Sequence, residues 1–521
     1  MYYFVPSWYG ESKKWVGETP YWFRVIEQLS FDDSIHQIKM FENSDEEARM
    51  LILGYQPHFR YFLHKLDIHS TSYWSFFDDI QGIQSNSVKI VDFKELSWPE
   101  GTYFIYSPFA ALARVGDQLL AEIHFSENGT LLAIQFFKDH QMDKRYLFDD
   151  RGFLSSIQFF ENGQLLHHDF LNQNGVWQVR EWHQQDQYWL EVNPQSDRAF
   201  MRSSYESWDQ LIEERLEVVK FKMIRADDVV VIAADQQHTE MLLEVFIDHT
   251  KMVSFFSRRL DVNNRDLVMT ILSQSTGVLV DSETTHDVLN QLSEEEGLPT
   301  DSIYRMTPFD TRLRLGQSHN MKEMILYCLV DGISDVHLDR ALKGLLGLVE
   351  ENPLLSLHFV TYKRQYPLTA LEQKVKDIIY STYDPSKFFS PKSDSGENQI
   401  DTQEEVETNR VTFSLFSTEE QIIQALDTAR LYIDLSETPD LYSQIASLSA
   451  GIPQILLVQS DFVKNHVNGW ILTDVEEINK AVHYFCDGLA NWNQSLVGAV
   501  ERMSDYTSGR LIEQWKEFVK K

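Results

Sequence analysis

Four short stretches between residues 429 and 472 decide the fold. They are ARLYIDLS (429–436), ETPD (437–440), SLSAGIPQILLV (447–458) and VNGWIL (467–472). Two of them contain apolar runs of strand length, which are typical of strands buried on both faces of a parallel sheet. Gly451 and Pro453 stand where a helix rich in small residues should end. The order predicts strand, acidic loop, helix and strand, as in a parallel α/β layer.

The same alternation extends through the second half of the chain. Residues 324–330 predict a strand, and residues 336–350 predict a helix with four leucines on one face. Residues 384–409 are polar and rich in Pro, Ser, Asp and Glu, so we expect a surface loop there. Further strands are expected at 354–360, 411–415, 431–435 and 454–458.

The first half of the chain begins with another α/β layer. Apolar runs at 2–5 and 50–53 predict buried strands, and residues 20–41 between them have helical spacing. Apolar runs at 228–234 and 277–280 predict later strands of the same sheet.

Residues 103–193 have a different period, in which apolar and polar residues alternate. Four turn motifs in this segment end in glycine, at Gly129, Gly152, Gly163 and Gly175. Asn-Gly favours tight hairpins because both residues tolerate positive φ. The segment therefore predicts an antiparallel β-meander of six or seven strands.

Together these patterns predict an α/β protein with two Rossmann-like domains and an antiparallel β-meander domain inserted in the N-terminal one. The N-terminal domain is expected at residues 1–102 and 194–300, and the meander at 103–193. The C-terminal domain is expected at 301–504. Residues 505–521 predict an amphipathic helix, which we expect to pack back on the N-terminal domain.

The charge of the chain limits its partners. The chain has 46 Lys and Arg against 79 Asp and Glu, which gives a formal charge of −33. Nucleic acids and anionic membranes bind proteins through Lys and Arg, so we expect no nucleic acid and at most peripheral membrane contact.

Cys328 and Cys486 are too few for a disulfide framework or a cysteine zinc site. The N-terminus has no basic leader, and no apolar run approaches the roughly 20 residues of a membrane helix. These features favour the cytoplasm.

Motifs of common catalytic sites are absent from the sequence. There is no G-x-G-x-x-G, P-loop, G-x-S-x-G or D-x-D pattern. The ligand-type residues His58, His64, Asp67 and His69 lie close in sequence, but their spacing fits no zinc site. We therefore predict no catalytic residue, no cofactor and no metal.

An aromatic loop follows the first strand. It contains Trp8 and Tyr9, and Trp15 and Trp22 come soon after. Ligands of open α/β sheets bind beyond the carboxyl ends of the strands, and aromatic rings suit the flat faces of sugars. These four rings are candidates for glycan or acceptor binding, with packing into the domain core as the alternative.

In order and spacing, the stretches at 429–472 resemble the C-terminal domain of GT-B glycosyltransferases. The resemblance implies a GT-B-like fold, in which a nucleotide-sugar donor lies against the acidic loop and the following helix N-terminus. The family's two donor-binding glutamates, in its E-x7-E motif, fall here on Thr438 and Ala446. Its basic pair should follow Val330, where this sequence has acid instead, Asp331 and Asp335. Acid repels a diphosphate, so we expect a degenerate donor site.

A closer resemblance spans essentially the whole chain. The opening YFVPSWY (3–9), the inserted meander and VDGIS (330–334) resemble the family of first accessory secretory proteins of the accessory Sec system. The resemblance implies a non-catalytic adaptor needed for the export of glycosylated serine-rich repeat adhesins. It implies a complex with the second and third accessory secretory proteins, which passes the adhesin to a dedicated SecA motor. The implied location is the cytoplasm, with peripheral contact at the inner face of the cell membrane left open.

Two other functions stay open at this point. An active GT-B glycosyltransferase would need other cations for its UDP-sugar, and the basic residues nearest in sequence to the donor strand are Arg312, Arg314, Lys322 and Arg340. Alternatively, the chain would be a regulatory subunit that activates a partner glycosyltransferase through paired β-domains.

Overall fold

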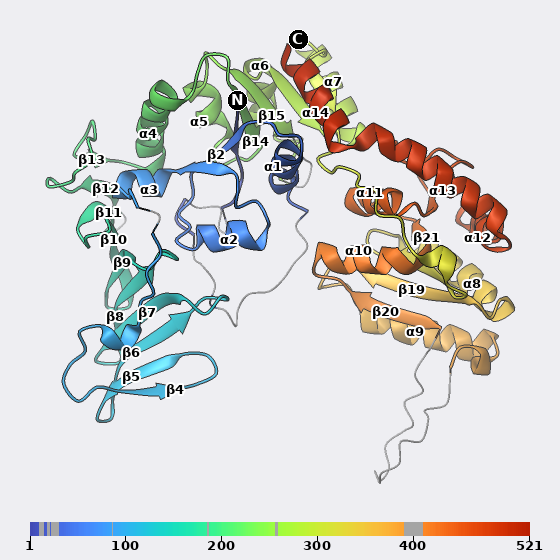
Figure 1. Ribbon diagram of the computed structural model, residues 1–521, viewed down its shortest axis with the longest axis horizontal. Coiled ribbons are helices and arrows are strands. Elements are labelled where there is room, and N and C mark those ends of the chain that lie inside the picture. Colours follow the sequence, from blue (N-terminus) through green and yellow to red (C-terminus); the bar gives the residue numbers. More distant parts are fainter. Residues whose placement is uncertain are drawn as a thin grey trace. The chain divides into compact units, whose positions relative to one another are not determined.

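The computed structural model describes residues 1–9, 15–17, 21, 31–85, 87–184, 187–255, 259–389 and 410–520. The chain forms two compact units (Figure 1). Unit 1 comprises Met1–Ile26, Ser34–Pro308 and Ile512–Lys521, and unit 2 comprises Glu27–Asp33 and Phe309–Leu511. No helix in the described ranges combines the length and the apolar composition needed to cross a membrane.

Unit 1 is built on a seven-stranded parallel sheet in the order β17-β16-β15-β14-β1-β2-β3. Its central strands, β1 (Tyr2–Val5) and β14 (Val229–Ala233), pair side by side although they are far apart in sequence. Every residue of β14 is buried, which explains why its sequence is a continuous apolar run. The other strands are β2 (Ala48–Ile52), β3 (Ser72–Ser75), β15 (Thr250–Phe255), β16 (Gly277–Val280) and β17 (Ile303–Arg305).

Serine caps set the starts of several unit 1 helices. The hydroxyls of Ser75, Ser207 and Ser282 each accept a hydrogen bond from the backbone N–H three residues later. The helix predicted at 20–41 lies partly outside the described residues, and within them α1 begins at Asp33. The helices are α1 (Asp33–Asn43), α2 (Phe59–Lys65), α3 (Phe76–Gln81), α4 (Trp208–Met223), α5 (Thr239–Val245), α6 (Arg265–Gln274) and α7 (Glu283–Glu295).

Between β3 and β14 the chain forms a ten-stranded antiparallel sheet, whose strands follow one another in sequence order from β4 to β13 (Figure 1). Nine of these strands lie between residues 103 and 192, so the prediction of six or seven was wrong. The strands are β4 (Tyr103–Tyr106), β5 (Ala111–Val115), β6 (Gln118–Phe125), β7 (Leu131–Lys138), β8 (Gln141–Phe148), β9 (Leu154–Glu161), β10 (Gln164–Leu171), β11 (Trp177–Gln184), β12 (Gln187–Val192) and β13 (Ser204–Tyr205).

The missed strands result from turns that carry no Asn-Gly motif. Asp139 and His140 both have positive φ, 50° and 63°, and join β7 to β8 without any glycine. Asp is one of the few residue types besides glycine that enters this region readily. Asn162 and Gly163, by contrast, form the tight turn that their sequence predicts, with φ of 53° and 79°.

The meander shares its core with the parallel sheet of unit 1. Phe170, Val179 and Leu190 are buried in one cluster with Tyr3 of β1 and Val230 of β14. A second cluster lies among β5, β6 and β7 and is centred on buried residues such as Phe93, Ile123 and Ile134.

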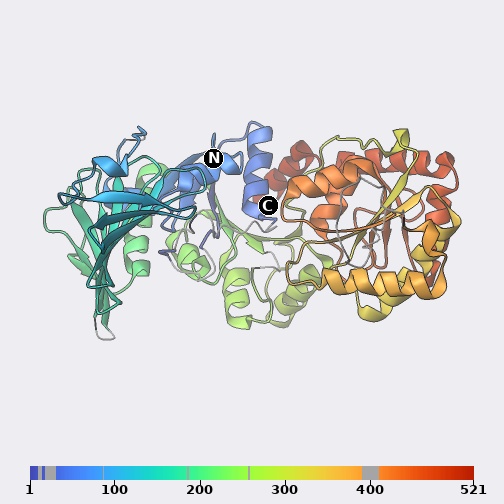
Figure 2. The ribbon, with the colours of Figure 1, turned by 90° about the horizontal axis from the view of Figure 1, so that it is seen from below.

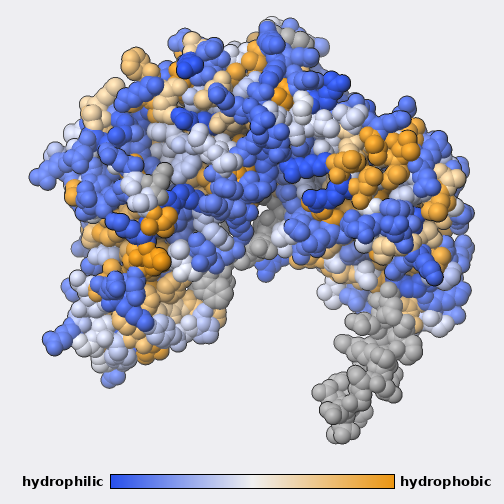
Figure 3. Space-filling view, viewed as in Figure 1, coloured by the Kyte–Doolittle hydropathy of each residue, from blue (hydrophilic) through white to orange (hydrophobic). Residues whose placement is uncertain are grey.

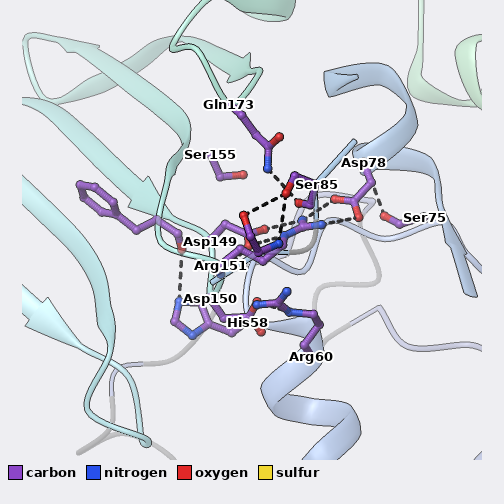
Figure 4. A network of polar contacts seen from close by, with 12 residues as sticks. His58, Arg60, Ser75, Asp78, Ser85, Asp149, Asp150, Arg151, Ser155 and Gln173 are labelled. Atoms are coloured by element: carbon purple, nitrogen blue, oxygen red, sulfur yellow. Dashed lines mark hydrogen bonds and ion pairs between the residues drawn. The ribbon is translucent and has the colours of Figure 1, made fainter. Parts of the chain in front are cut away.

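A buried ionic network also joins the meander to α3 (Figure 4). Arg151, in the β8–β9 turn, donates hydrogen bonds to Asp149 at 2.7 and 2.8 Å. The same guanidinium donates to Asp78 of α3 at 2.9 and 2.6 Å. Arg60 of α2 donates to the neighbouring Asp150 at 3.0 Å. The meander is therefore joined to α2 and α3 of the same unit by charge pairs as well as by apolar packing. We call Asp78, Asp149 and Arg151 the junction network.

The C-terminal helix α14 (Ser508–Lys520) belongs to unit 1 from Ile512 onward. Trp515 is fully buried, and its ring meets those of Tyr2 and Phe41 edge-on at 6.4 and 5.8 Å. Phe518 stacks on Tyr304 of β17 with ring centroids 4.1 Å apart. These contacts hold the end of the chain against strands of the first sheet.

Unit 2 is built on a six-stranded parallel sheet in the order β20-β19-β18-β21-β22-β23, with helices on both sides (Figure 2). Its strands are β18 (Met324–Leu329), β19 (Leu355–Thr361), β20 (Val411–Leu415), β21 (Ala429–Asp434), β22 (Gln454–Leu456) and β23 (Gly469–Ile471). Its helices are α8 (Asp335–Glu351), α9 (Leu368–Thr382), α10 (Glu419–Thr428), α11 (Leu441–Ala450), α12 (Ile478–Cys486) and α13 (Leu489–Met503).

Candidate functional site at the carboxyl end of the second sheet

The loops that follow β18 and β21 meet at one edge of the unit 2 sheet. The two strands are parallel neighbours, with Leu329 opposite Asp434. Gly332, in the loop after β18, has φ of +75°, and a Cβ there would lie 3.3 Å from the Cβ of Ser436 in the loop after β21. Because ligands of open α/β sheets bind at this edge, it is the candidate site.

Asp434 is the buried centre of this edge. One carboxylate oxygen accepts hydrogen bonds from the backbone N–H and the hydroxyl of Ser436, at 3.1 and 2.7 Å. The other oxygen accepts from the Tyr432 hydroxyl and the Asp440 backbone N–H, both at 2.9 Å. Burial raises the pKa of Asp434 to about 6, against the opposing effect of these four donors.

A chain of hydroxyl groups continues from this centre. Asp440 caps α11 by accepting from the backbone N–H and the hydroxyl of Ser443, at 2.8 and 2.7 Å. The Ser443 hydroxyl hydrogen-bonds the Tyr362 hydroxyl at 2.7 Å, and Tyr362 hydrogen-bonds the Tyr327 hydroxyl at the same distance. Burial raises the pKa of both tyrosines, so they stay neutral and hydrogen-bonded at physiological pH.

Asp331 and Asp335, which stand at the place of the family's basic pair, have different surroundings. Asp331 accepts hydrogen bonds from the Thr361 hydroxyl at 2.6 Å and the Tyr362 backbone N–H at 2.7 Å. It therefore links the loop after β18 to the carboxyl end of β19. Asp335 is exposed in the first turn of α8, where a negative charge favours the helix N-terminus.

Aromatic rings border the same edge. Phe31 belongs to unit 2 and is buried there, with its ring stacked on Tyr442 of α11 at 4.7 Å. Tyr362 meets Phe31 edge-on at 5.8 Å, and Phe309 meets Tyr442 edge-on at 5.4 Å. Phe31 has φ of 45°, a region that a bulky residue rarely occupies. No pattern in the sequence pointed to Phe31, because it lies about 300 residues from Phe309 and no periodicity links them.

The positions of the E-x7-E motif do not converge on a ligand. Thr438 is exposed in the loop before α11. Ala446 is half-buried in α11 and packs against the unit 2 core. Neither side chain carries the carboxylate that the E-x7-E motif would present to a nucleotide-sugar donor.

The four candidate replacement cations have different surroundings, and two of them, Arg312 and Arg314, lie near enough to Tyr442 for their charges to act on its hydroxyl. Lys322 precedes β18 and so lies at the opposite, amino end of the sheet. Arg312 and Arg314 are exposed, and their backbone N–H groups donate to Ser449 near the carboxyl end of α11, each at 3.2 Å. Arg340 is exposed on α8.

The aromatic loop of unit 1 is largely built into the domain. Tyr9 is buried, and its hydroxyl hydrogen-bonds Nδ1 of His238 at 2.5 Å. Trp15 is buried, and its indole N–H donates to Asp209 at 2.8 Å. Trp8 is half-buried, with its ring 5.1 Å from that of Phe62. Trp22 lies outside the described residues.

The ligand-type histidines near residue 60 are divided between two environments. His58 is buried and bonds the backbone oxygen of Phe148 at 3.2 Å, whereas His64 and His69 stack on each other at 4.5 Å. In the part of the chain that the structure describes, no group of three or more His, Cys, Asp and Glu side chains is arranged to hold a metal.

Comparison with known proteins identifies the family and the fold. The family model for the first accessory Sec system protein matches residues 1–521. The chain is 36% identical over 525 residues to the first accessory Sec system protein of Streptococcus gordonii, covering 100% of this chain and 99% of that protein.

Solved structures agree. A chain of the crystal structure of accessory secretory protein 1, 2 and 3 in Streptococcus pneumoniae is similar with a TM-score of 0.79 and 31% identity, covering 100% of this chain and 99% of that one. The pneumococcal O-GlcNAc transferase GtfA, solved with UDP and GlcNAc, is similar with a TM-score of 0.70 at 11% identity, covering 100% and 98%. This second likeness concerns the fold alone, and it confirms the predicted GT-B-like α/β architecture. The chain belongs to the family of first accessory Sec system proteins.

Proposed function

We propose that this protein is a non-catalytic adaptor of the accessory Sec system that keeps a glycosyltransferase fold without a working donor site. One observation carries the proposal: its own side chains occupy the carboxyl end of the unit 2 sheet. Asp434 accepts four hydrogen bonds there, and Tyr362 joins Tyr327 to Ser443. A UDP-sugar would have to displace these contacts and bring its diphosphate next to Asp331 and Asp434. Phosphate needs Lys, Arg or free N–H groups as partners.

The degenerate donor positions are part of this proposal. Asp331 and Asp335 stand where the GT-B family places its basic pair, and Thr438 and Ala446 stand where it places two glutamates. A transferase must stabilise the negative charge that develops on the leaving diphosphate, and the carboxylates of Asp331 and Asp335 cannot replace a basic pair in this role.

The partners follow from the family. The S. pneumoniae crystal structure contains accessory secretory proteins 1, 2 and 3. We infer that this chain likewise binds the second and third accessory secretory proteins. The complex would receive the glycosylated serine-rich repeat adhesin in the cytoplasm and pass it to the accessory SecA motor, with any membrane contact peripheral.

Isothermal titration with UDP-GlcNAc and UDP-glucose tests the donor site directly. We expect no binding up to 1 mM of either nucleotide sugar. An active GT-B glycosyltransferase titrated in the same buffer serves as the control. Low-micromolar binding, or transfer of the sugar to a serine-rich peptide, would make the protein an enzyme and refute the proposal.

Affinity purification of the tagged chain from its native cytoplasm tests the adaptor role. Recovery of the second and third accessory secretory proteins in stoichiometric amounts is expected. A stable complex with a glycosyltransferase in their place would favour the regulatory-subunit alternative.

Among the rings proposed for glycan contact, Trp8 has the best access. Tyr9 and Trp15 are buried with their polar atoms bonded inside unit 1, whereas Trp8 is half-buried. Replacing Trp8 by alanine should weaken binding of a GlcNAc-bearing serine-rich peptide about tenfold if this ring stacks on sugar, with Trp189→Ala on the meander as the control. Unchanged affinity would remove Trp8 from the proposal.

A further inference from the structure

The segment that contains Arg312 and Arg314 has a structural role that its sequence did not suggest. Its backbone lies along the carboxyl end of α11, where Arg314 N–H donates to Ser449 O at 3.2 Å and Gly316 N–H donates to Ala450 O at 2.9 Å. With the backbone fixed in this way, the side chains face outward. Leu313 is 72% exposed and Leu315 is 43% exposed.

The outer face of the neighbouring helix α13 is mixed: it exposes apolar side chains beside the polar Asn493, Gln494 and Glu501. Trp492 and Ala499 are buried against the core, whereas Leu489, Val497 and Val500 are 55%, 56% and 38% exposed. Leu489, Leu496 and Val500 are seven and four residues apart, so they form one stripe about 16 Å long on the helix. Leu496 is half-buried and packs against the unit 2 core, so the exposed part of the stripe is Leu489 and Val500, with Val497 beside it. Exposed apolar side chains grouped in this way mark interaction sites.

The segment and the helix form one continuous surface. The Cβ position of Gly451 lies 2.9 Å from both a Leu315 methyl group and a Leu496 methyl group, so these two leucines are neighbours. Figure 3 shows apolar side chains gathered over α13 and beside it. We call this the α13 surface; its members are Leu313, Leu315, Leu489, Leu496, Val497 and Val500.

A cavity that is open to solvent lies at the amino end of α13, and His483 and Asp487 line it together with apolar side chains. Its volume is about 380 Å³, and its walls include Trp470, Tyr484, Ala490 and Asn491. Lys480 lies over the Trp470 ring, with its ammonium 5.5 Å from the ring centroid. The cavity is large enough for one aromatic or branched aliphatic side chain.

Charge distinguishes the other end of the surface. Arg312 and Arg314 flank Leu313 and are both exposed, in a protein whose formal charge is −33. Nε of Arg312 lies 3.6 Å from a carboxylate oxygen of Asp310. Two arginines are too few to hold so acidic a chain on an anionic bilayer, but they suit one or two carboxylates of a protein.

We propose that the α13 surface binds an amphipathic helix of a protein partner in the secretory complex, an inference that rests on the proposed adaptor function. The partner helix has apolar residues at i, i+4, i+7 and i+11, the spacing that an apolar helical groove recognises. One end carries Asp or Glu opposite Arg312 and Arg314. The other end places a large apolar side chain in the cavity beside Trp470.

Charge-introducing variants of the exposed positions test this surface. Leu313→Asp and Val497→Asp are paired with the control Phe221→Asp, an apolar residue 92% exposed on α4 of unit 1. The probe is the purified complex of the second and third accessory secretory proteins, and the readout is the Kd from titration calorimetry. We expect each α13-surface variant to weaken binding at least tenfold and the control to leave it unchanged. Thermal melting confirms that all three variants are folded.

A charge-reversed pair tests the acidic end of the partner helix. The double variant Arg312→Glu with Arg314→Glu should weaken binding at least tenfold, and the loss should shrink as salt is raised. An unchanged Kd for Leu313→Asp and Val497→Asp overturns the docking surface while leaving the adaptor function intact. Failure of the wild type to bind the two proteins overturns both.

Other occupants give different results. If the variants abolish self-association of the chain in sedimentation experiments, or its flotation with phosphatidylglycerol vesicles, while binding of the two proteins is unaffected, the partner-helix proposal is wrong.

Discussion

Two polar clusters in this molecule satisfy their carboxylates with different partners, a guanidinium in one and neutral hydroxyl and N–H groups in the other. In the junction network, Asp78 and Asp149 share the guanidinium of Arg151. At the carboxyl end of the unit 2 sheet, Asp331 and Asp434 accept hydrogen bonds from hydroxyl and backbone N–H groups.

The difference shows what each cluster is for. A single guanidinium bonds both carboxylates of the junction, offsets one of their two negative charges and so joins the meander to α3. Small neutral donors at the second site satisfy the carboxylates, and in the function proposed above they also occupy the space that a diphosphate would need. Arginine thus pairs with the carboxylates of the junction network, whereas hydroxyl and backbone N–H groups bond Asp331 and Asp434 at the edge of the unit 2 sheet.

Removing the cation from the junction should have the largest effect on stability. Arg151→Ala leaves the buried Asp149 and the half-buried Asp78 without their shared partner, and desolvation already raises the pKa of both carboxyls. We expect the free energy of unfolding of unit 1 to fall by about 3–5 kcal/mol, measured by urea denaturation. Arg265→Ala is the control, because Arg265 pairs with Glu295 and Glu296 at the solvent-exposed surface, where water and salt screen the charges. If the two variants lose the same free energy of unfolding, the junction network does not stabilise unit 1 more than a surface ion pair does.

The carboxyl edge should respond to pH in a predictable direction. Asp434 keeps its proton up to a pKa of about 6 in the folded protein, against 3.8 for an ordinary aspartate. The native state then binds more protons than the unfolded state between these values, so the stability that Asp434 contributes is full below pH 4 and is lost as pH rises through 6. At about 1.4 kcal/mol per pKa unit, the loss amounts to about 3 kcal/mol.

Asp434→Asn isolates this contribution from other titrating groups. The difference in unfolding free energy between wild type and variant, measured in urea at pH 4.5 and pH 7, should shift by about 2 kcal/mol in favour of the variant at the higher pH. A difference that does not change with pH would mean that Asp434 is ionised throughout.

Breaking the hydroxyl chain should cost less. Tyr362→Phe removes the hydroxyl that joins Tyr327 to Ser443, leaving the buried Tyr327 hydroxyl without this partner. We expect a loss of about 1–2 kcal/mol in a thermal or urea unfolding experiment on unit 2. Tyr380→Phe, at an exposed tyrosine of α9, should change stability by less than about 0.5 kcal/mol. If the two variants behave alike, the hydroxyl chain contributes nothing to closing the edge.

Restoring the motif should have the smallest effect. Thr438→Glu combined with Ala446→Glu rebuilds E-x7-E but leaves Asp434, Tyr362 and Phe31 in place. The double variant should still show no UDP-GlcNAc binding up to 1 mM in calorimetry. Recovery of micromolar binding would mean that two glutamates were all the site lacked, and that the buried cluster is no obstacle.

The sequence predicted what depends on local pattern. Buried apolar runs located β14, β18 and β21, and the spacing around Gly451 placed the GT-B-like C-terminal domain. Asn162-Gly163 marked its own turn, because glycine is strongly favoured at positive φ. Asp139-His140 did not, since these residues enter the same region only where the strands around them require it.

The content of the candidate site depends on contacts that no local pattern reveals. The sequence alone shows acid, Asp331 and Asp335, where the GT-B resemblance expects a basic pair, and the consequence for donor binding stays a prediction. That Tyr362 and Phe31 fill the edge could not be inferred, since both reach it from distant parts of the chain. The sequence left Trp15 open between glycan contact and core packing; its burial in the unit 1 core and its bond to Asp209 show that it is a core residue.

The position of α14 has a consequence for how the protein is made. Trp515 of α14 covers the rings of Tyr2 in β1 and Phe41 in α1. The first strand is therefore fully covered only when α14, the last helix in the element order, has packed against it. A ribosome releases chains from the N-terminus, and a domain can close only when all its parts have emerged. The strands of unit 2, which lie within residues 324–471, are therefore all synthesised before α14, whereas the first strands of unit 1 lack part of their cover until α14 has been made. A nascent chain arrested before Trp515 would leave the rings of Tyr2 and Phe41 open to chaperones and proteases. Packing of α14 is therefore the step that completes the core of unit 1.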